Sequence, residues 1–279
     1  MTADRIDDRD WSTLTLGEQI QQIEVEGYVL LPNLLDADEI AELKAVTAGF
    51  ETTGVDYSEQ QRGRSHIEFT GGKITALIAH PTTTAFLREL FGGEAIIMSY
   101  VYARSEPGHP GISLHTDGQP YGSEIFGYEG SCPFLVRVLY YLDDLTPNVS
   151  PFRVVPRSHL SMHADANPYK RYESHPEQVM VTAKAGSAVL LNHKAFHGNY
   201  PNTGDRPREM LAIGYRPEWA GPVAEVDEWD AEQVAKLPDA VRPFFGSRNQ
   251  RDWDFGGGNK PANMAREARG INPSRWQQT

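Results

Sequence analysis

The sequence predicts a mainly β fold, an antiparallel sandwich or barrel with flanking helices. Between residues 94 and 216, short apolar runs alternate with Gly, Pro, Asn and Asp, and no helical period separates them. Before residue 93, apolar residues recur at helical spacing instead. The 25 glycines and 19 prolines of this 279-residue chain are typical of a fold rich in turns and loops.

Three zones can be drawn along the chain, and we assign them to a single domain. Residues 1–93 form a helical N-terminal part, residues 94–216 a β core, and residues 217–279 a C-terminal extension. The extension holds a short helical pattern interrupted near Pro238, then glycine-rich polar sequence and a late Trp276. We hypothesise that it covers the barrel as a lid; the alternative is a frayed tail without a role.

Three helices are predicted in the N-terminal part. Two of them open with a capping box, in which an N-cap side chain and the residue three positions later satisfy each other's backbone amides. The two pairs are Thr15 with Glu18 and Asp36 with Glu39. Gly27 ends the first helix and the strand "YVLLP" follows, while the third helix runs from Pro81 to Gly92.

Six short strands are predicted in the core. Each is an apolar run rich in β-branched or aromatic residues, and turn chemistry such as "DDLTPN" or "PNTGDRP" separates them. The runs are "AIIMSYVYAR", "FLVRVLYYL", "FRVVP", "VMVTA", "SAVLL" and "MLAIGYR". Many short strands without intervening helices indicate an antiparallel arrangement of jelly-roll type.

Composition excludes several classes of partner and site. The net charge of -12 disfavours a nucleic-acid partner, because phosphate binding relies on clustered Lys and Arg. Cys132 is the single cysteine, so neither an internal disulfide nor a cysteine zinc site is expected. We find no leader-like N-terminus and no apolar stretch long enough to span a bilayer. The expectation is a cytoplasmic monomer or homodimer that does not contact membranes.

The stretch "SLHTDGQP" places His115 and Asp117 two residues apart. In an extended segment such residues face the same side, so an imidazole nitrogen and a carboxylate oxygen converge. That pair suits a divalent cation such as Fe(II), although two ligands make an unspecific site. Taken alone, the pattern fits a solvated turn with an aspartate-supported histidine better.

A third ligand has two main candidates in "NHKAFHGNYPN". His193 and His197 have the HxxxH spacing that binds zinc on a helix, but the preceding "GSAVLL" is strand-like, so the two need not share a face. We favour His197, which lies at the exit of an inward-facing strand. His159, in "PRSHL", is interpreted as structural.

Arg206 and Arg208 stand at the start of the last predicted strand, with Pro207 between them. A guanidinium is a two-pronged donor that matches a carboxylate, so an arginine beside a metal invites a dicarboxylate co-substrate. Because Pro207 separates them, we expect the two arginines to point in opposite directions, so that only one of them faces the interior. The alternative is a surface arginine in a charged turn, which is the better interpretation of Arg206 taken alone.

The order of these motifs resembles the phytanoyl-CoA dioxygenase family, the Fe(II)- and 2-oxoglutarate-dependent oxygenases. The motif is His-x-Asp, a histidine some eighty residues later and an arginine eleven beyond it. The resemblance covers about residues 16–216, including "GYVLLPNLLDADEIAELKA", "LHTDG", "YYLDDLTPNVSPFRVVPRSHL" and "AGSAVLLNHKAFHGNYPNTGDRPR". It implies a double-stranded β-helix, a jelly-roll and cupin-like core.

The resemblance also implies site residues. The implied iron ligands are His115, Asp117 and His197. Arg208 is the implied clamp on the distal carboxylate of 2-oxoglutarate, and Asn199 stands where many relatives support that carboxylate with Ser or Thr. Tyr102 matches a position that often reaches the co-substrate; the alternative is a core tyrosine.

Further residues are candidates for substrate binding. Arg137, Leu139 and Tyr141 alternate on one face of a strand, so Arg137 can point into the barrel, and Arg104 can do likewise. Either arginine suits an acidic substrate group, but a structural ion pair is the stronger expectation. The loop "QPYGSEIFGYEGSCP" is expected to border the pocket.

The implied reaction converts 2-oxoglutarate and O2 to succinate and CO2 while a small or medium-sized metabolite is oxidised. Hydroxylation is the expected outcome, and desaturation, epoxidation or cyclisation in natural-product biosynthesis is the alternative. Related halogenases lack the carboxylate, so Asp117 disfavours halogenation. Two other classes stay open, a zinc or manganese cupin-type isomerase or hydrolase and a non-catalytic binding module.

Overall fold

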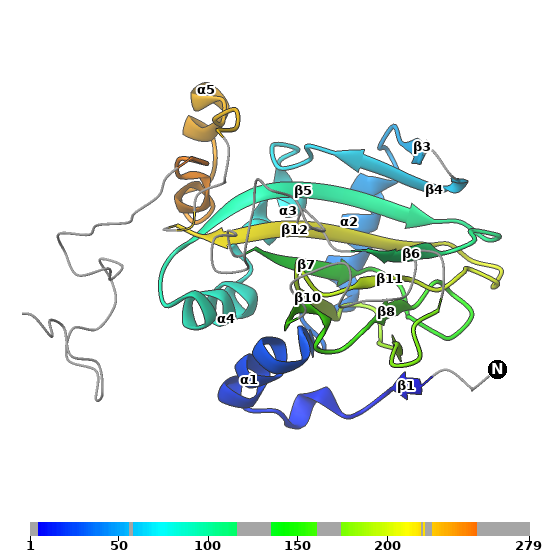
Figure 1. The fold of residues 1–279 in the computed structure, drawn as a ribbon. Helices are drawn as coiled ribbons and strands as arrows, with labels where there is room; N and C mark the ends of the chain where they lie inside the picture. The colour runs from blue at the N-terminus through cyan, green and yellow to red at the C-terminus, as the bar shows by residue number, and fades with distance from the viewer. Residues whose placement is uncertain are drawn as a thin grey trace, which may run out of the picture.

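A computed structural model of the chain contains two β-sheets and few helices (Figure 1), which confirms the predicted mainly β fold. The structure describes residues 5–55, 58–115, 135–160, 174–218, 220 and 225–249. All six predicted core strands are present, and together with strands from other parts of the chain they form the double-stranded β-helix.

The major sheet has seven strands in the order β2-β10-β7-β12-β5-β4-β3, and every neighbouring pair is antiparallel. Its longest strands, β5 and β12, lie side by side over ten paired positions. The strands are β2 (Tyr28–Leu31), β3 (Thr53–Val55), β4 (Ser58–Ser65), β5 (Ala95–Ser105), β7 (Val136–Tyr141), β10 (Ala188–Asn192) and β12 (Arg208–Pro217).

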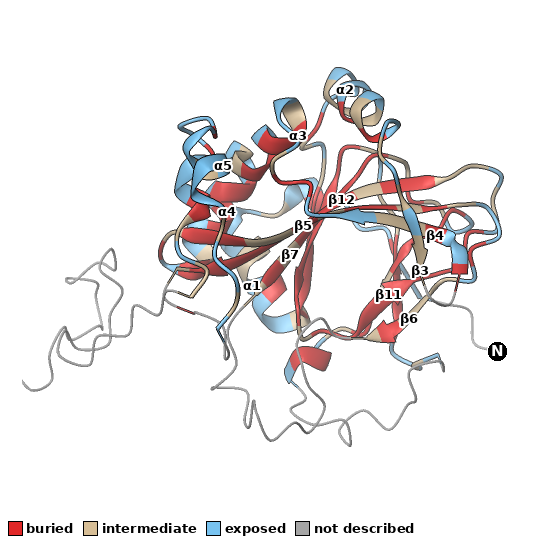
Figure 2. Ribbon diagram, turned by 90° about the horizontal axis from the view of Figure 1, so that it is seen from above, coloured by how far each residue is buried: buried red, intermediate tan, exposed pale blue. Residues whose placement is uncertain are grey.

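The minor sheet has five shorter strands in the order β1-β9-β8-β11-β6. β1 pairs with β9 in parallel, and the other neighbours are antiparallel. The strands are β1 (Arg5–Asp7), β6 (Ile112–His115), β8 (Phe152–Val154), β9 (Val179–Val181) and β11 (His197–Asn199). Figure 2 shows β6 and β11 across from β7 and β12, so residues of both sheets face the interior.

The predicted N-terminal helices are confirmed as α1 (Leu16–Glu26), α2 (Ala37–Thr47) and α4 (Pro81–Phe91). Both capping boxes form, and Gly27 ends α1 in the left-handed conformation at φ 86°. The remaining helices of the described residues are α3 (Gly72–Ala76), α5 (Ala231–Ala235) and four 3-10 turns at Trp11–Thr13, Leu77–Ala79, Ser158–Leu160 and Arg242–Phe245.

The face of the major sheet that points away from the minor sheet, here called the outer face, is covered by α3, α4 and the turn after α3. Tyrosine hydroxyls from the sheet reach these elements: Tyr140 donates to Thr83 Oγ1 at 2.7 Å and Tyr100 to the Ile74 carbonyl at 3.1 Å. The opposite face, here called the inner face, lies toward the minor sheet. Apolar residues of both faces belong to one continuous core.

The N-terminal part also contains strands that the helical prediction did not include. β3 and β4 form a hairpin that extends the major sheet beyond β5, and β1 joins the minor sheet. The sequence of β4, "SEQQRGRS", is polar and has no apolar alternation, so no local pattern indicates a strand. Backbone pairing with β5 decides its conformation.

The described part of the C-terminal extension packs at the end of β12 that is remote from Arg208 (Figure 1). There Arg216 donates to the carbonyls of Ser247 and Arg248 at 2.8 and 3.0 Å. The predicted lid falls mainly on residues after 249, which lie outside the described residues. The lid therefore stays a prediction.

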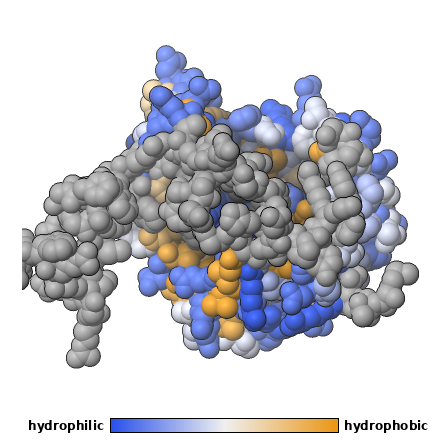
Figure 3. All heavy atoms as spheres, in the orientation of Figure 1, coloured by the Kyte–Doolittle hydropathy of each residue, from blue (hydrophilic) through white to orange (hydrophobic). Residues whose placement is uncertain are grey.

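The described surface is mostly hydrophilic on the face shown in Figure 3. The large apolar side chains exposed among the described residues are Ile6, Leu16, Val25 and Leu160. No helix within the described ranges is long and apolar enough to cross a membrane.

Candidate functional site

Two histidines meet between neighbouring strands of the minor sheet. His115 ends β6 and His197 begins β11, and the two residues are direct partners in the antiparallel ladder. Directly opposed residues share one face of a sheet. Their ring centroids are 4.4 Å apart with an angle of 41° between the rings. The structure therefore brings two of the predicted ligands side by side.

Local hydrogen bonds orient both rings. The Nδ1 atom of His115 lies 2.8 Å from the Ser113 carbonyl oxygen, and that of His197 lies 2.9 Å from the Ala195 carbonyl oxygen. A carbonyl oxygen only accepts, so each Nδ1 carries the hydrogen and each Nε2 carries the lone pair. A backbone carbonyl on one ring nitrogen is the usual support for a histidine that binds metal through the other.

The competing histidines lie elsewhere. His193 Nδ1 is 2.8 Å from the Leu135 carbonyl oxygen, at the entry to β7, so the HxxxH pair does not form a site on one helix face. His159 Nε2 is 2.8 Å from the Glu24 carbonyl oxygen, and its ring lies against Gly27 at the end of α1. These contacts agree with a structural interpretation of His159.

Asp117 lies outside the described residues, two positions beyond the end of β6. Within the described ranges, no group of three His, Cys, Asp or Glu side chains is arranged to hold a metal ion. The described chain therefore contributes two imidazoles to the candidate metal centre. The third ligand stays a prediction.

Arg208 opens β12 and its side chain is completely buried. Its Nη2 donates to Ser150 Oγ at 3.5 Å, and its guanidinium carbon lies 5.6 Å from the centroid of the Tyr141 ring. Its Nε and Nη1 find no hydrogen-bond acceptor among the described residues. Burial lowers the pKa of Arg208 from its ordinary value, while Tyr141 and Asp143 oppose that shift. A buried guanidinium with unmet donors is the chemical complement of a carboxylate.

Tyr141 adjoins Arg208, and Asn199 lies on the same strand as His197. Asn199 follows His197 by two residues on β11, and its Nδ2 donates to the Ser150 carbonyl at 3.4 Å. Burial raises the pKa of Tyr141 to about 12, against the opposing effects of the Arg208 charge and the nearby Asn199 side chain. Tyr141 is therefore a neutral phenol at physiological pH, and Asn199 is already engaged with the backbone.

The expectation that Tyr102 reaches the co-substrate is wrong. Tyr102 pairs with Leu211, three residues from Arg208 along β12, so the two side chains point to opposite faces of the sheet. Its hydroxyl donates to Glu209 Oε2 at 2.6 Å, and its ring packs edge-on against Phe50. Tyr102 is a core tyrosine of the outer face, which was the alternative interpretation.

The expectation that Arg104 can point into the barrel is wrong for the same reason. It lies opposite Glu209 on the outer face, and its Nε is 2.7 Å from Glu106 Oε1. Arg104 does not point into the barrel, and the structural ion pair is confirmed. Arg137, by contrast, lies opposite Gly214 on β12 and shares the inner face with Leu139 and Tyr141. It remains a candidate for contact with a substrate.

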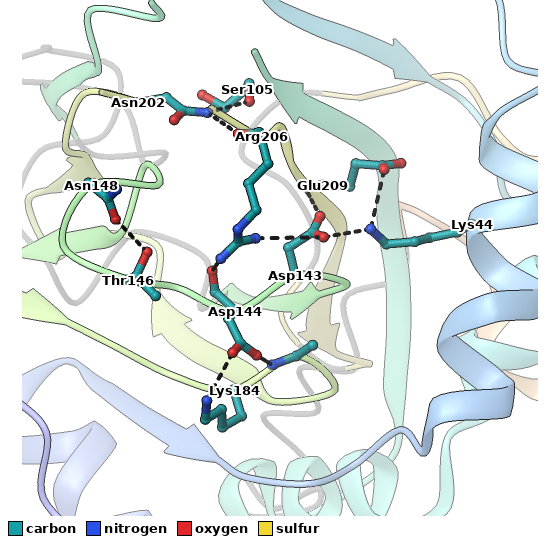
Figure 4. Close-up of polar contacts among 11 residues, drawn as sticks. Lys44, Ser105, Asp143, Asp144, Thr146, Asn148, Lys184, Asn202, Arg206 and Glu209 are labelled. Atoms are coloured by element: carbon teal, nitrogen blue, oxygen red, sulfur yellow. Dashed lines mark hydrogen bonds and ion pairs between the residues drawn. The ribbon is translucent and has the colours of Figure 1, made fainter. Parts of the chain in front are cut away.

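Arg206 takes the outward position. Its Nη2 donates to the Asp144 carbonyl at 2.9 Å, and Nη1 lies 3.9 Å from Asp143 Oδ1 (Figure 4). Asn202 clamps the turn before Arg208 by donating to the carbonyls of Ser105 and Arg206. The prediction that only one of the two arginines faces the interior is confirmed, and that one is Arg208.

Sequence reasoning missed a set of buried polar residues around Arg208. Ser150 accepts from Arg208 and lies 3.0 Å from Ser105 Oγ, and the nearby His109 imidazole is buried. Burial, together with the Arg208 charge, lowers the pKa of His109 to about 4, so its imidazole is neutral. Polar residues at interior strand positions, such as Ser105 at the end of an apolar strand, were the available signal.

A family model and several solved structures match the chain. The model described as phytanoyl-CoA dioxygenase (PhyH) matches residues 23–210. The 2-oxoglutarate-dependent epimerase SnoN of nogalamycin biosynthesis is 20% identical with a TM-score of 0.63, over 84% of this chain and 94% of that one.

HygX from Streptomyces hygroscopicus, solved with nickel, 2-oxoglutarate and hygromycin B, is 18% identical with a TM-score of 0.62, over 79% of this chain and 94% of that one. The carbocyclase SnoK of nogalamycin biosynthesis is 18% identical with a TM-score of 0.60, over 83% of this chain and 94% of that one. These structures share the fold described above.

Proposed function

Because the chain belongs to the phytanoyl-CoA dioxygenase family, we propose that His115, Asp117 and His197 bind its iron and that Arg208 binds 2-oxoglutarate. The family makes the protein an Fe(II)- and 2-oxoglutarate-dependent oxygenase. The observation that carries the assignment of Arg208 is its buried guanidinium, whose Nε and Nη1 have no acceptor among the described residues. A carboxylate is a suitable acceptor for such donors.

The chemistry of the site divides between the bound groups and the chain. Iron, when bound with 2-oxoglutarate, would activate O2 for the oxidation of the substrate. The chain presents the Nε2 lone pairs of the two histidines and excludes water with buried side chains of both sheets, including Phe152, whose ring centroid is 6.0 Å from that of His197. Arg208 orients the co-substrate from its far end.

The substrate that we propose is a small or medium-sized metabolite, and the outcome that we propose is hydroxylation. The similar structures include HygX with hygromycin B bound and SnoN with nogalamycin RO bound, which supports a small molecule of natural-product type. An epimerase and a carbocyclase share the fold, so epimerisation and cyclisation are the competing outcomes. Arg137 on the inner face suits an acidic group on the substrate.

Anaerobic titration tests the assignment. Adding Fe(II) and then 2-oxoglutarate to the wild type should produce the weak visible absorption band of an iron-bound 2-oxo acid. His197→Ala should lose the band and the metal, whereas Arg208→Met should keep the metal and lose 2-oxoglutarate. Arg206→Met, at the outward-facing arginine, is the matched control and should behave as the wild type. Undiminished binding of 2-oxoglutarate by Arg208→Met would refute the proposal.

A further inference from the structure

Three buried polar residues form a row across the inner face of the major sheet. Arg208 on β12 is the direct partner of Ser105 on β5, and Ser105 is the direct partner of Gln61 on β4. Residues directly opposed in antiparallel strands share a face, so all three side chains point to the same side. Gln61 is 4% exposed, and Ser105 and Arg208 are not exposed at all.

The neighbours of Gln61 confirm which face it occupies. The next residue, Arg62, lies opposite Arg104 and donates to Thr52 Oγ1 at 2.9 Å. Arg64 lies opposite Tyr102, with its guanidinium carbon 4.8 Å from the Phe50 ring centroid. These arginines belong to the outer face, so Gln61 belongs to the inner face with Arg208.

Both ends of the row carry polar atoms without partners in the part of the chain that the structure describes. Gln61 Oε1 is buried and has no hydrogen-bond partner among the described residues, as is the case for Arg208 Nε and Nη1. Leaving a buried polar atom unsatisfied costs about 1–3 kcal/mol, so native structures rarely tolerate it without a reason. Two such groups on one face of the sheet can be satisfied by one shared occupant.

The row places a long side chain on each side of a short one. Neighbouring strands lie about 4.8 Å apart, so the backbones of Arg208 and Gln61 are separated by roughly 10 Å across the short Ser105 side chain. A long side chain on each flank and a small one between them leave room for a small group held from both sides. Ser105 is itself held by Ser150, whose Oγ lies 3.0 Å away.

The charge of the row favours an anion. Gln61 and Ser105 are neutral, and the Arg208 guanidinium is a buried cation whose Nε and Nη1 have no hydrogen-bond acceptor among the described residues. His109, which adjoins Arg208, is neutral because its pKa is lowered to about 4, mainly by burial. A bound carboxylate would neutralise Arg208 and accept further hydrogen bonds from neutral donors.

We propose that Gln61 is a second residue that holds the distal carboxylate of the co-substrate, opposite Arg208. The amide ends of a glutamine exchange places by a half-turn of the terminal torsion, so Gln61 can present its NH2 group to an anion. The inference rests on the proposed role of Arg208. It makes β4, a strand of the N-terminal part, a contributor to the selection of a 2-oxo diacid over a 2-oxo monoacid.

Calorimetry on the nickel-loaded protein, which needs no turnover, tests the proposal. The two probes are 2-oxoglutarate and 2-oxopentanoate, which has the same five-carbon chain without the distal carboxylate. Gln61→Ala should weaken 2-oxoglutarate binding about tenfold, as expected for a lost hydrogen bond to a charged group, and leave 2-oxopentanoate binding unchanged. Gln61→Glu should weaken 2-oxoglutarate binding about 100-fold, because two carboxylates would then adjoin.

Control variants separate the possible failures. Gln60→Ala alters the exposed neighbouring glutamine and should bind both probes as the wild type does. Because Glu has the size of Gln, Gln61→Glu keeps the packing if Gln61→Ala does not fold. Wild-type affinity for 2-oxoglutarate in both Gln61 variants, with binding lost in Arg208→Met, would overturn the role of Gln61 alone. Equal weakening of both probes would also overturn it, and unimpaired binding by Arg208→Met would instead remove the proposed function.

Discussion

Arg208 and Glu209 are consecutive, charged and buried, yet they differ in how many of their polar atoms have partners among the described residues. On the outer face, the Glu209 carboxylate accepts from Tyr102 at 2.6 Å and from Thr47 Oγ1 at 3.3 Å, and it lies 3.5 Å from Lys44 Nζ. Its backbone amide donates to Asp143 Oδ2 at 2.8 Å (Figure 4). On the inner face, Arg208 keeps two donors without an acceptor among the described residues.

The two faces of β12 therefore differ in purpose: the outer face contributes to stability, and the inner face is prepared for ligand binding. The outer face matches a buried charge with protein groups, and burial together with the bond to Glu209 raises the pKa of Tyr102, which therefore stays a hydrogen-bond donor. The inner face leaves a buried charge unmatched, which costs stability until an anion binds. Removing Arg208 and removing Glu209 should therefore have opposite consequences.

The largest expected effect is on ligand binding by Arg208→Met. Affinity for 2-oxoglutarate should fall about 1000-fold, because the variant loses a buried charged contact. Without the ligand, the variant should be at least as stable as the wild type, since it no longer buries an unpaired charge. Thermal melts with and without 2-oxoglutarate measure both effects. A melting temperature several degrees below that of the ligand-free wild type would contradict the comparison.

Glu209→Ala should have the reverse profile. It leaves the Tyr102 hydroxyl without its acceptor and Lys44 with Asp143 alone, at 2.6 Å. We expect a loss of about 3 kcal/mol in the free energy of unfolding, measured by urea denaturation. Affinity for 2-oxoglutarate in the folded variant should stay within a few-fold of the wild type. A stability equal to that of the wild type would show that the outer network is dispensable.

The buried His109 imidazole beside Arg208 should make the stability of the protein depend on pH. Its pKa is lowered in the folded protein from 6.5 to about 4, so the unfolded chain binds a proton more readily. The stability contribution of the neutral imidazole is therefore complete above pH 6.5 and is lost as the pH falls toward 4. Between pH 7 and 5 we expect the wild type to lose about 2 kcal/mol more than His109→Gln, measured by urea denaturation at each pH. Parallel pH dependences in the two proteins would exclude this role.

Arg206→Ala should have the smallest effect. The side chain is 39% exposed, and its ion pair with Asp143 is long, at 3.9 Å. Partly exposed ion pairs contribute little, so we expect a change below about 1 kcal/mol in unfolding and none in 2-oxoglutarate affinity. The matched pair of arginines, two positions apart, then reports the inner and outer environments separately. A large loss of 2-oxoglutarate affinity in Arg206→Ala would contradict that distinction.

Local chemistry determined much of the fold in advance. The capping boxes at Thr15 and Asp36, the left-handed Gly27 and the apolar runs of the core are short-range signals, and each produced the expected element. The polar β4 carries no such signal, because its strand state comes from pairing with β5 and not from its own side chains.

The sequence by itself determined the candidate residue types and their order along the chain, because both are properties of the side chains alone. Arg206 and Arg208 point in different directions because Arg206 lies in the turn before β12, whereas Arg208 opens the strand. Only the tertiary structure decided which face was inward. A strand pattern has two equivalent sides until the helices cover one of them, and this assignment moved Tyr102 and Arg104 to the outer face. It also brought Gln61, 147 positions before Arg208 in the chain, into the row with it through the register of three strands.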